Sequence, residues 1–173
     1  MDFTQFTDID LDDMRATPKT IVNTTARWVP KGSHRQKDFT AVAHRDEGEV
    51  YRIFLRVSEH NGSVFSAGIM RIFPSGDNLV LARYNGGYHP HGNIIERTKV
   101  PAVTHKHLAT ERYIRAGLDP DGYAEPITGY NDIDGAFATL RRDCGIADFG
   151  RGPSSTDAEP TAPHTPNQPG LFD

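Results

Sequence analysis

Hydrophobic and polar residues alternate with a period of two through much of the first half of the chain. The clearest alternation runs from Val50 to Val57, where one set of side chains is wholly apolar (Tyr51, Ile53, Leu55 and Val57) and the other includes two arginines (Val50, Arg52, Phe54 and Arg56). Because successive side chains of a strand point to opposite faces, this pattern predicts a strand with one buried face. Runs rich in β-branched and aromatic residues predict strands at 20–28, 38–44, 49–59, 64–73, 79–84 and 100–108.

Turn residues between these runs predict how the strands are connected. Asn61-Gly62 is a strong hairpin signal, and the Pro74-to-Asn78 segment also has turn composition. Strands joined by such short turns are antiparallel neighbours. We therefore expect an antiparallel meander sheet of about five to six strands.

Two helices are predicted after the last strand. Thr110 is placed to cap a helix that Gly117 ends, and Asn131-Asp132 precedes a second helix that ends before Gly145. The apolar residues of the second helix recur at helical spacing up to Cys144. We expect both helices to cover one face of the sheet, which gives an α+β fold.

The two ends of the chain differ in composition from the middle. Residues 1–19 are acidic and predict a short, loosely packed amphipathic helix, residues 20–149 form the single α+β domain, and residues 150–173 are rich in Pro, Ser and Thr, which predicts a disordered tail. The lone Cys144 is expected to be a buried helix residue. With no secretion signal and no run of apolar residues long enough for a membrane span, we expect a cytoplasmic protein.

Charge is unevenly distributed along the chain. The formal net charge is −4, yet the segment from Arg83 to Arg115 contains six cations and two anions, a local net charge of +4. A basic middle between acidic ends indicates that an anionic partner is bound locally.

Four of the eight histidines fall in two short motifs, His89-Pro90-His91 and His105-Lys106-His107. In a strand, the spacing of two places His105 and His107 on one face and Lys106 on the other. Such imidazoles can act as the acid and the base of phosphodiester cleavage, or they can hold zinc or nickel. The metal alternative would use His91, His105 and His107.

Neighbouring cations favour phosphate chemistry without a metal or other cofactor. Arg83 and Lys106 are candidates to stabilise a phosphorane, with His105 or His107 as base and His91 as acid. Asn93 and Arg112 are candidates for binding a phosphate or a base, and Tyr84 and Tyr88 for stacking on unpaired bases. These assignments predict an endoribonuclease that binds RNA.

The order of these motifs resembles that of a known family. Arg83-Tyr84-Asn85, then His89-x-His91-x-Asn93, then His105-Lys106-His107 resembles small phage and toxin-antitoxin proteins, in particular the TumE-type toxins. The resemblance covers roughly residues 79–146. It implies a sheet-plus-helix ribonuclease toxin with an antitoxin protein as partner, and it carries over to Arg83, His91, Asn93, His105 and His107.

The C-terminal peptide from Gln168 to Phe172 carries a separate signal. Its glutamine followed by Leu171-Phe172 looks like the short peptide by which bacterial replication proteins dock on the sliding clamp. A third hypothesis follows, in which the chain is a non-enzymatic accessory module of a phage or mobile element that binds a host factor through its basic face or this tail.

Overall fold

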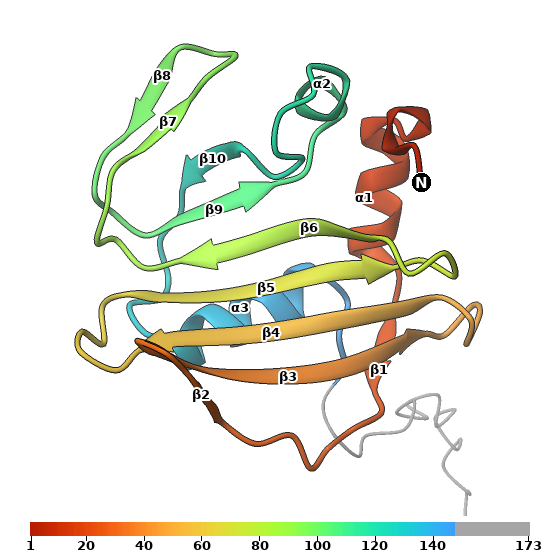
Figure 1. Cartoon of the computed structure of the whole chain (residues 1–173), viewed down its shortest axis with the longest axis horizontal. Coiled ribbons are helices and arrows are strands. Elements are labelled where there is room, and N and C mark those ends of the chain that lie inside the picture. The colour runs from red at the N-terminus through yellow and green to blue at the C-terminus, as the bar shows by residue number, and fades with distance from the viewer. Residues whose placement is uncertain (148–173) are drawn as a thin grey trace, which may run out of the picture.

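Four long antiparallel strands, each joined to the next by a short turn, form the centre of the computed structural model, which describes residues 1–147 (Figure 1). The strands are β3 (His34–Ala43), β4 (Val50–Ser58), β5 (Phe65–Ile72) and β6 (Asn78–Asn85). The turn at Asn61-Gly62 is closed by a hydrogen bond from the Val64 amide to the Asn61 carbonyl. The predicted antiparallel meander is thus confirmed.

Shorter strands extend the sheet on both sides to eight strands in all. β1 (Lys19–Ile21) and β2 (Val29–Lys31) pair with β3, whereas β9 (His105–Leu108) pairs with β6 and β10 (Tyr123–Pro126) pairs with β9. β7 (His91–Asn93) and β8 (Thr98–Val100) form a separate hairpin. The strand predicted at 20–28 is therefore reduced to three residues, and the one predicted at 100–108 is divided between β8 and β9 around Pro101.

The helix α3 (Ile133–Asp143) covers one face of the sheet (Figure 1). The Asp132 side chain caps it by accepting a hydrogen bond from the Gly135 amide, as predicted, and Phe137 stacks on Phe39 of β3. Leu140 and Cys144 are buried. The sheet and α3 together enclose the hydrophobic core.

The other predicted helix does not cover this face. α2 (Glu111–Arg115) has five residues and packs against the 3-10 helix η1 (Phe3–Gln5) instead. Thr110 does not cap it, because its hydroxyl makes no hydrogen bond there. Gly117, with φ of 69°, lies just beyond its end.

The N-terminal segment is well packed, contrary to the expectation of a loose helix. In α1 (Asp8–Ala16), Thr7 and Asp10 form a capping box, and Leu11 and Met14 are buried in the same core. Arg15 Nη1 donates hydrogen bonds to the backbone carbonyls of Leu81 and Ala109. The acidic residues of this segment therefore lie on the solvent-facing side of a helix that packs on the core.

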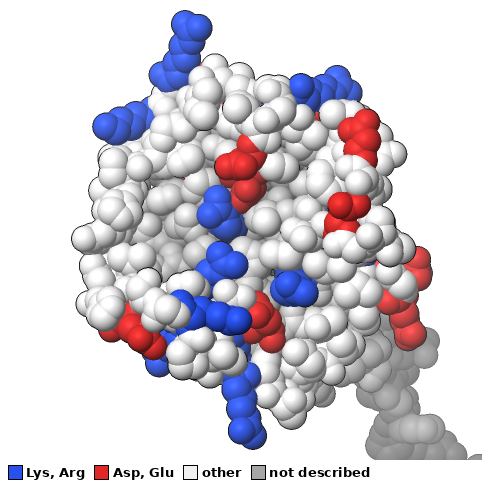
Figure 2. Space-filling view, viewed as in Figure 1, with Lys and Arg blue, Asp and Glu red and all other residues white. Residues whose placement is uncertain are grey.

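The face of the sheet opposite α3 carries polar side chains. Strand register aligns Arg56, Ser66, Asn85 and His105 in one row across β4, β5, β6 and β9, and a second row contains Phe54, Gly68, Arg83 and His107. Figure 2, viewed onto this face, shows a group of Lys and Arg side chains at its centre with acidic groups beside them. Four of the predicted site residues, Arg83, His91, His105 and His107, line a cavity on this open face.

Two expectations from the sequence concern other parts of the chain. The predicted disordered tail and the clamp-docking residues Gln168, Leu171 and Phe172 lie outside the described residues. Within residues 1–147, none of the helices combines the length and the apolar character that crossing a membrane requires.

Candidate active site

Strand β9 presents its two histidines to the open face and its lysine to the other face. His105 and His107 are Cα partners of Asn85 and Arg83 on β6, whereas Lys106 is the partner of Tyr84. Lys106 Nζ pairs with a Glu125 carboxylate oxygen at 2.9 Å. The alternation predicted for this motif is confirmed. The role predicted for Lys106 in stabilising a phosphorane is corrected, because a strand directs its side chain away from the histidines.

The hairpin of β7 and β8 brings His91 to the same place. Asn93 attaches this hairpin to β10, since its Nδ2 donates to the Ala124 carbonyl at 2.9 Å and its Oδ1 accepts from the Ala124 amide at 2.8 Å. A third hydrogen bond joins Nδ2 to Thr98 Oγ1. Asn93 is buried and fully used in these contacts. It therefore positions His91, and the substrate-binding role predicted for it is corrected.

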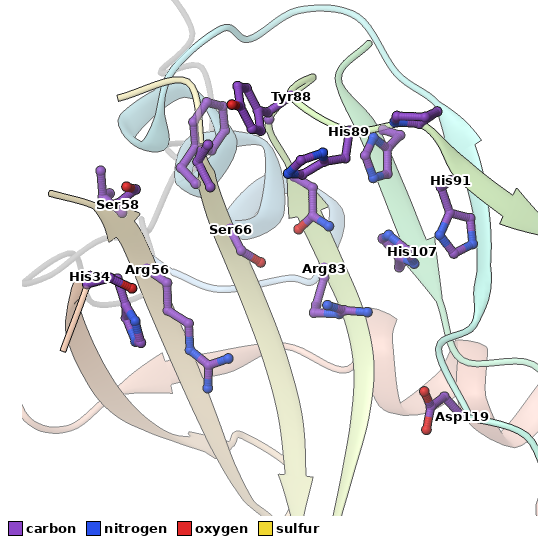
Figure 3. A pocket seen from close by; sticks show the side chains of 18 of the residues that line it. His34, Arg56, Ser58, Ser66, Arg83, Tyr88, His89, His91, His107 and Asp119 are labelled. Atoms are coloured by element: carbon purple, nitrogen blue, oxygen red, sulfur yellow. The ribbon is translucent and has the colours of Figure 1, made fainter. Parts of the chain in front are cut away.

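The three imidazoles of His91, His105 and His107 form one cluster. Figure 3 labels two of them, His91 and His107. The ring centroids of His91 and His107 lie 4.5 Å apart, those of His105 and His107 lie 5.0 Å apart, and those of His91 and His105 lie 6.2 Å apart. The expectation that two separate motifs bring their rings together is confirmed. The three rings are therefore close enough to face the same bound group in the cavity that they line.

Backbone carbonyls fix the tautomers of these rings. His105 Nδ1 lies 2.8 Å from the Val103 carbonyl, and His107 Nδ1 lies 3.0 Å from the Asp121 carbonyl. Because a carbonyl oxygen only accepts, each Nδ1 carries the proton and each Nε2 keeps its lone pair. In His91 it is Nε2 that carries a proton, because Nε2 lies 2.8 Å from the Gly122 carbonyl.

Burial keeps two of the rings neutral. The pKa of His107 is lowered to about 3, mainly by burial and to a smaller extent by Arg83, His91 and His105. Burial also lowers the pKa of His105, with smaller effects of His91 and Arg83 in the same direction. A ring that is neutral at pH 7 has the lone pair that a base needs and lacks the extra proton that an acid gives up.

Arg83 is held beside the histidines by Asp121. Arg83 Nε forms an ion pair with Asp121 Oδ2, and Asp121 is buried. The same residue thus binds Arg83 with its carboxylate and His107 with its carbonyl. Only the Nε donor of the guanidinium is used in this pair, and Figure 3 shows the Arg83 side chain among the pocket residues near His107.

These side chains line a cavity of about 660 Å³ on the open face (Figure 3). Arg83, His91, His105 and His107 lie on one side of it. The lining also includes residues that the sequence did not predict for the site, among them His34, Arg56, Ser66, Asn85 and Asp119. For Arg56 the signal was present, because the alternation along Val50 to Val57 placed it on the wet face of its strand.

The other predicted binding residues lie in different places. Tyr84 is buried under α3, where its hydroxyl donates to an Asp143 carboxylate oxygen at 2.8 Å, so its predicted stacking role is corrected. Arg112 is also corrected, since it pairs with Glu96 and lies over the Tyr123 ring, outside the cavity lining. Tyr88 does line the cavity and is half exposed, as a stacking residue requires.

Much of the basic segment is neutralised by ion pairs. Of its six cations, Arg83, Lys106, Arg112 and Arg115 each pair with a carboxylate. Arg97 and Lys99 are exposed on the β7–β8 hairpin. Within residues 1–147, the arginine of the cavity lining that no carboxylate pairs with is therefore Arg56 of β4, whereas Arg83 is paired with Asp121.

Within residues 1–147, no group of three or more His, Cys, Asp or Glu side chains is arranged so that it could hold a metal ion. In this part of the chain, the alternative zinc or nickel ligands His91, His105 and His107 are therefore not among groups with such an arrangement.

Comparison of the chain with protein-family models, with curated proteins and with solved structures gave no match.

Proposed function

We propose that this protein is a toxin-like endoribonuclease that cleaves RNA by histidine acid and base catalysis without a metal ion. The single observation that carries the proposal is the cluster of His91, His105 and His107 beside the Arg83 guanidinium. RNA carries its own nucleophile, the 2′-hydroxyl next to each phosphate. Cleavage therefore needs only two proton transfers and stabilisation of negative charge.

His107 is the proposed base. Its Nε2 lone pair is available because Nδ1–H is held by the Asp121 carbonyl, and it is the Cα partner of Arg83, which would hold the phosphate next to it. A bound phosphate favours the protonated imidazole, opposing the burial that lowers the pKa of His107. Substrate binding would thus move this base toward the range in which proton transfer is efficient.

His91 is the proposed acid, and His105 lies beside both rings. In the reaction the 2′ oxygen forms a bond to phosphorus as His107 removes its proton. The bond from phosphorus to the 5′ oxygen breaks as a doubly protonated His91 donates its Nδ1 proton to that oxygen, while its Nε2–H stays on the Gly122 carbonyl. The products are a 2′,3′-cyclic phosphate and a 5′-hydroxyl, and Arg83 stabilises the negative charge that develops on the phosphate oxygens.

The experiment that tests this proposal is incubation of the purified chain with single-stranded RNA in the presence of EDTA. We expect cleavage that EDTA does not reduce, and we expect expression of the chain to arrest bacterial growth. Cleavage that EDTA abolishes and added divalent ions restore would contradict the metal-free mechanism. Absence of cleavage under both conditions would contradict the nuclease proposal itself.

A further inference from the structure

The row of Arg56, Ser66, Asn85 and His105 extends the cavity from the histidines across the open face. These residues are Cα partners on neighbouring strands, so their side chains stand next to one another. Three strand spacings separate the ends of the row, which is about 14 Å. Only the His105 end belongs to the histidine cluster, and the proposed reaction leaves the other three residues without a role.

The two middle residues of the row contain polar atoms without partners. Ser66 Oγ and Asn85 Oδ1 are shielded from solvent, and neither has a hydrogen-bond partner within the described part of the chain. Both residues line the cavity. A shielded polar atom without a partner destabilises the folded state, so two of them side by side at a cavity indicate a ligand that supplies the missing bonds.

Arg56 stands at the far end of the row as an available cation. Its guanidinium lies 4.8 Å from the centroid of the Phe54 ring, and its Nε donates to Gln36 Oε1 at 2.9 Å. It is exposed and forms no ion pair with any residue in 1–147. Both neighbours hold the guanidinium in place while leaving its charge uncompensated, which suits a phosphate.

We infer that this row binds the nucleotide next to the scissile phosphate, and that the substrate is therefore single-stranded RNA. The inference rests on the proposed function for the position of the scissile phosphate at the histidines. Asn85 and Ser66 bind the base, and Arg56 binds the phosphate on its far side. After rotation of the two side chains, Asn85 Oδ1 accepts from a base N–H, and the Ser66 hydroxyl donates to a ring nitrogen or carbonyl oxygen.

Duplex RNA does not satisfy these atoms. In a duplex the hydrogen-bonding edge of each base is occupied by its partner, whereas an unpaired base presents that edge to the protein. Tyr88, half exposed at the cavity, adds a ring on which an unpaired base can stack. The row therefore selects unpaired nucleotides.

Binding can be measured apart from cleavage with a short RNA in which every ribose is 2′-O-methylated, because this strand lacks the nucleophile. Fluorescence anisotropy gives its Kd for the wild type and for Arg56→Gln, Ser66→Ala and Asn85→Ala. Arg35→Gln is the matched control, since Arg35 lies on the other face of β3 over the Trp28 ring. Melting temperatures of all variants are recorded in parallel.

We expect Arg56→Gln to weaken RNA binding roughly tenfold. The slope of log K against log salt concentration should become shallower by about 0.7, as for the loss of one phosphate contact. Ser66→Ala and Asn85→Ala should each weaken binding by roughly fivefold with the salt slope unchanged. Arg35→Gln should keep the wild-type Kd. Ser66→Ala should not lower the melting temperature, because it removes an unpartnered hydroxyl, so its effect on binding is not a folding defect.

The outcomes separate this inference from the proposed function. Wild-type cleavage together with unchanged Kd values in the Arg56, Ser66 and Asn85 variants would overturn the binding row alone. An absence of cleavage, with binding of the methylated strand that depends on Arg56, would overturn the nuclease and leave the row in place. Equal affinity for a duplex of the same sequence would also overturn the row, because its base contacts require an unpaired strand.

Discussion

His91 of β7 and His107 of β9 lie with their ring centroids 4.5 Å apart and their planes at 78°, although β7 belongs to a hairpin outside the main sheet. Asn93 fixes this hairpin to β10 through two hydrogen bonds to Ala124, and the His91 ring itself lies 2.8 Å from the Gly122 carbonyl. The distance between the proposed acid and the proposed base therefore depends in part on Asn93, which lies two residues along the strand from His91.

Replacement of Asn93 by alanine tests this positioning role. The change removes three hydrogen bonds and leaves the Ala124 amide and carbonyl without their partner, so we expect the free energy of unfolding to fall by about 2 kcal/mol. Cleavage should also fall, since the hairpin that carries His91 loses its bonds to β10 and the ring keeps only its contact with the Gly122 carbonyl. Chemical denaturation and RNA cleavage are the measurements, with Asn78→Ala at the exposed start of β6 as the control. Wild-type stability in Asn93→Ala would contradict the positioning role.

The base is tested most cleanly by His107→Asn. The asparagine Nδ2 can replace the imidazole Nδ1–H as donor to the Asp121 carbonyl, while the Nε2 lone pair is lost. We expect the cleavage rate to fall by about 10²- to 10⁴-fold with little change in melting temperature. His60→Asn, in the exposed turn after β4, should leave the rate unchanged. A rate for His107→Asn within a few-fold of the wild type would remove His107 as the base.

Arg83 and Asp121 form a pair whose contributions to stability and to catalysis can be separated. Arg83→Gln should lower the cleavage rate by about 10²- to 10³-fold. It should also destabilise the fold by about 1 to 2 kcal/mol, because the buried Asp121 loses its partner.

The double variant Arg83→Gln, Asp121→Asn distinguishes these effects. Removal of the unpaired carboxylate should recover much of the stability but none of the activity. Recovery of cleavage together with stability would show that Arg83 acts only on the fold. Arg97→Gln, on the exposed hairpin, serves as the control for loss of one positive charge.

Stability should depend on pH through His107. The pKa of His107 is about 3 in the folded protein, and an unfolded histidine has a pKa of about 6.5. Between these values the unfolded chain binds the proton and the folded chain does not, so the free energy of unfolding falls as the pH falls. This one group should remove about 2 kcal/mol between pH 7.5 and pH 5.

The measurement is denaturant unfolding across this range. In His107→Asn the dependence on pH should be shallower, although His105, whose pKa is also lowered by burial, still contributes. An equal slope in the wild type and in His107→Asn would show that His107 is not the group that titrates.

The parts of the fold that depend on local signals were predictable. The Asn61-Gly62 turn and the alternation along β4 define the meander, and Asp132 caps α3 as expected. β10 was missed because Tyr123-Ala124-Glu125-Pro126 is short and contains a proline, and its pairing with β9 comes from tertiary contact. The tight packing of α1 was missed for the same reason, since only Leu11 and Met14 reach the core.

In the candidate site, too, the residues placed by local sequence spacing were predictable and those placed by tertiary contacts were not. The spacing of His105 and His107 fixes their common face within one strand, and the approach of His91 was expected from its motif. Arg56, Ser66 and Asn85 come together only through the register of β4, β5 and β6, which the sequence does not specify residue by residue. The internal roles of Asn93 and Tyr84 likewise depend on Ala124 and Asp143, which are distant in sequence.

The most direct test of the central claim is the chemistry of the cleaved ends. The substrate is a DNA oligonucleotide with a single ribonucleotide, incubated with the wild-type protein in EDTA and analysed by mass spectrometry. Attack by the 2′-hydroxyl predicts one cut, on the 3′ side of the ribose, with a 2′,3′-cyclic phosphate and a 5′-hydroxyl as ends. A cut at a deoxyribonucleotide, or ends with a 3′-hydroxyl and a 5′-phosphate, would contradict it.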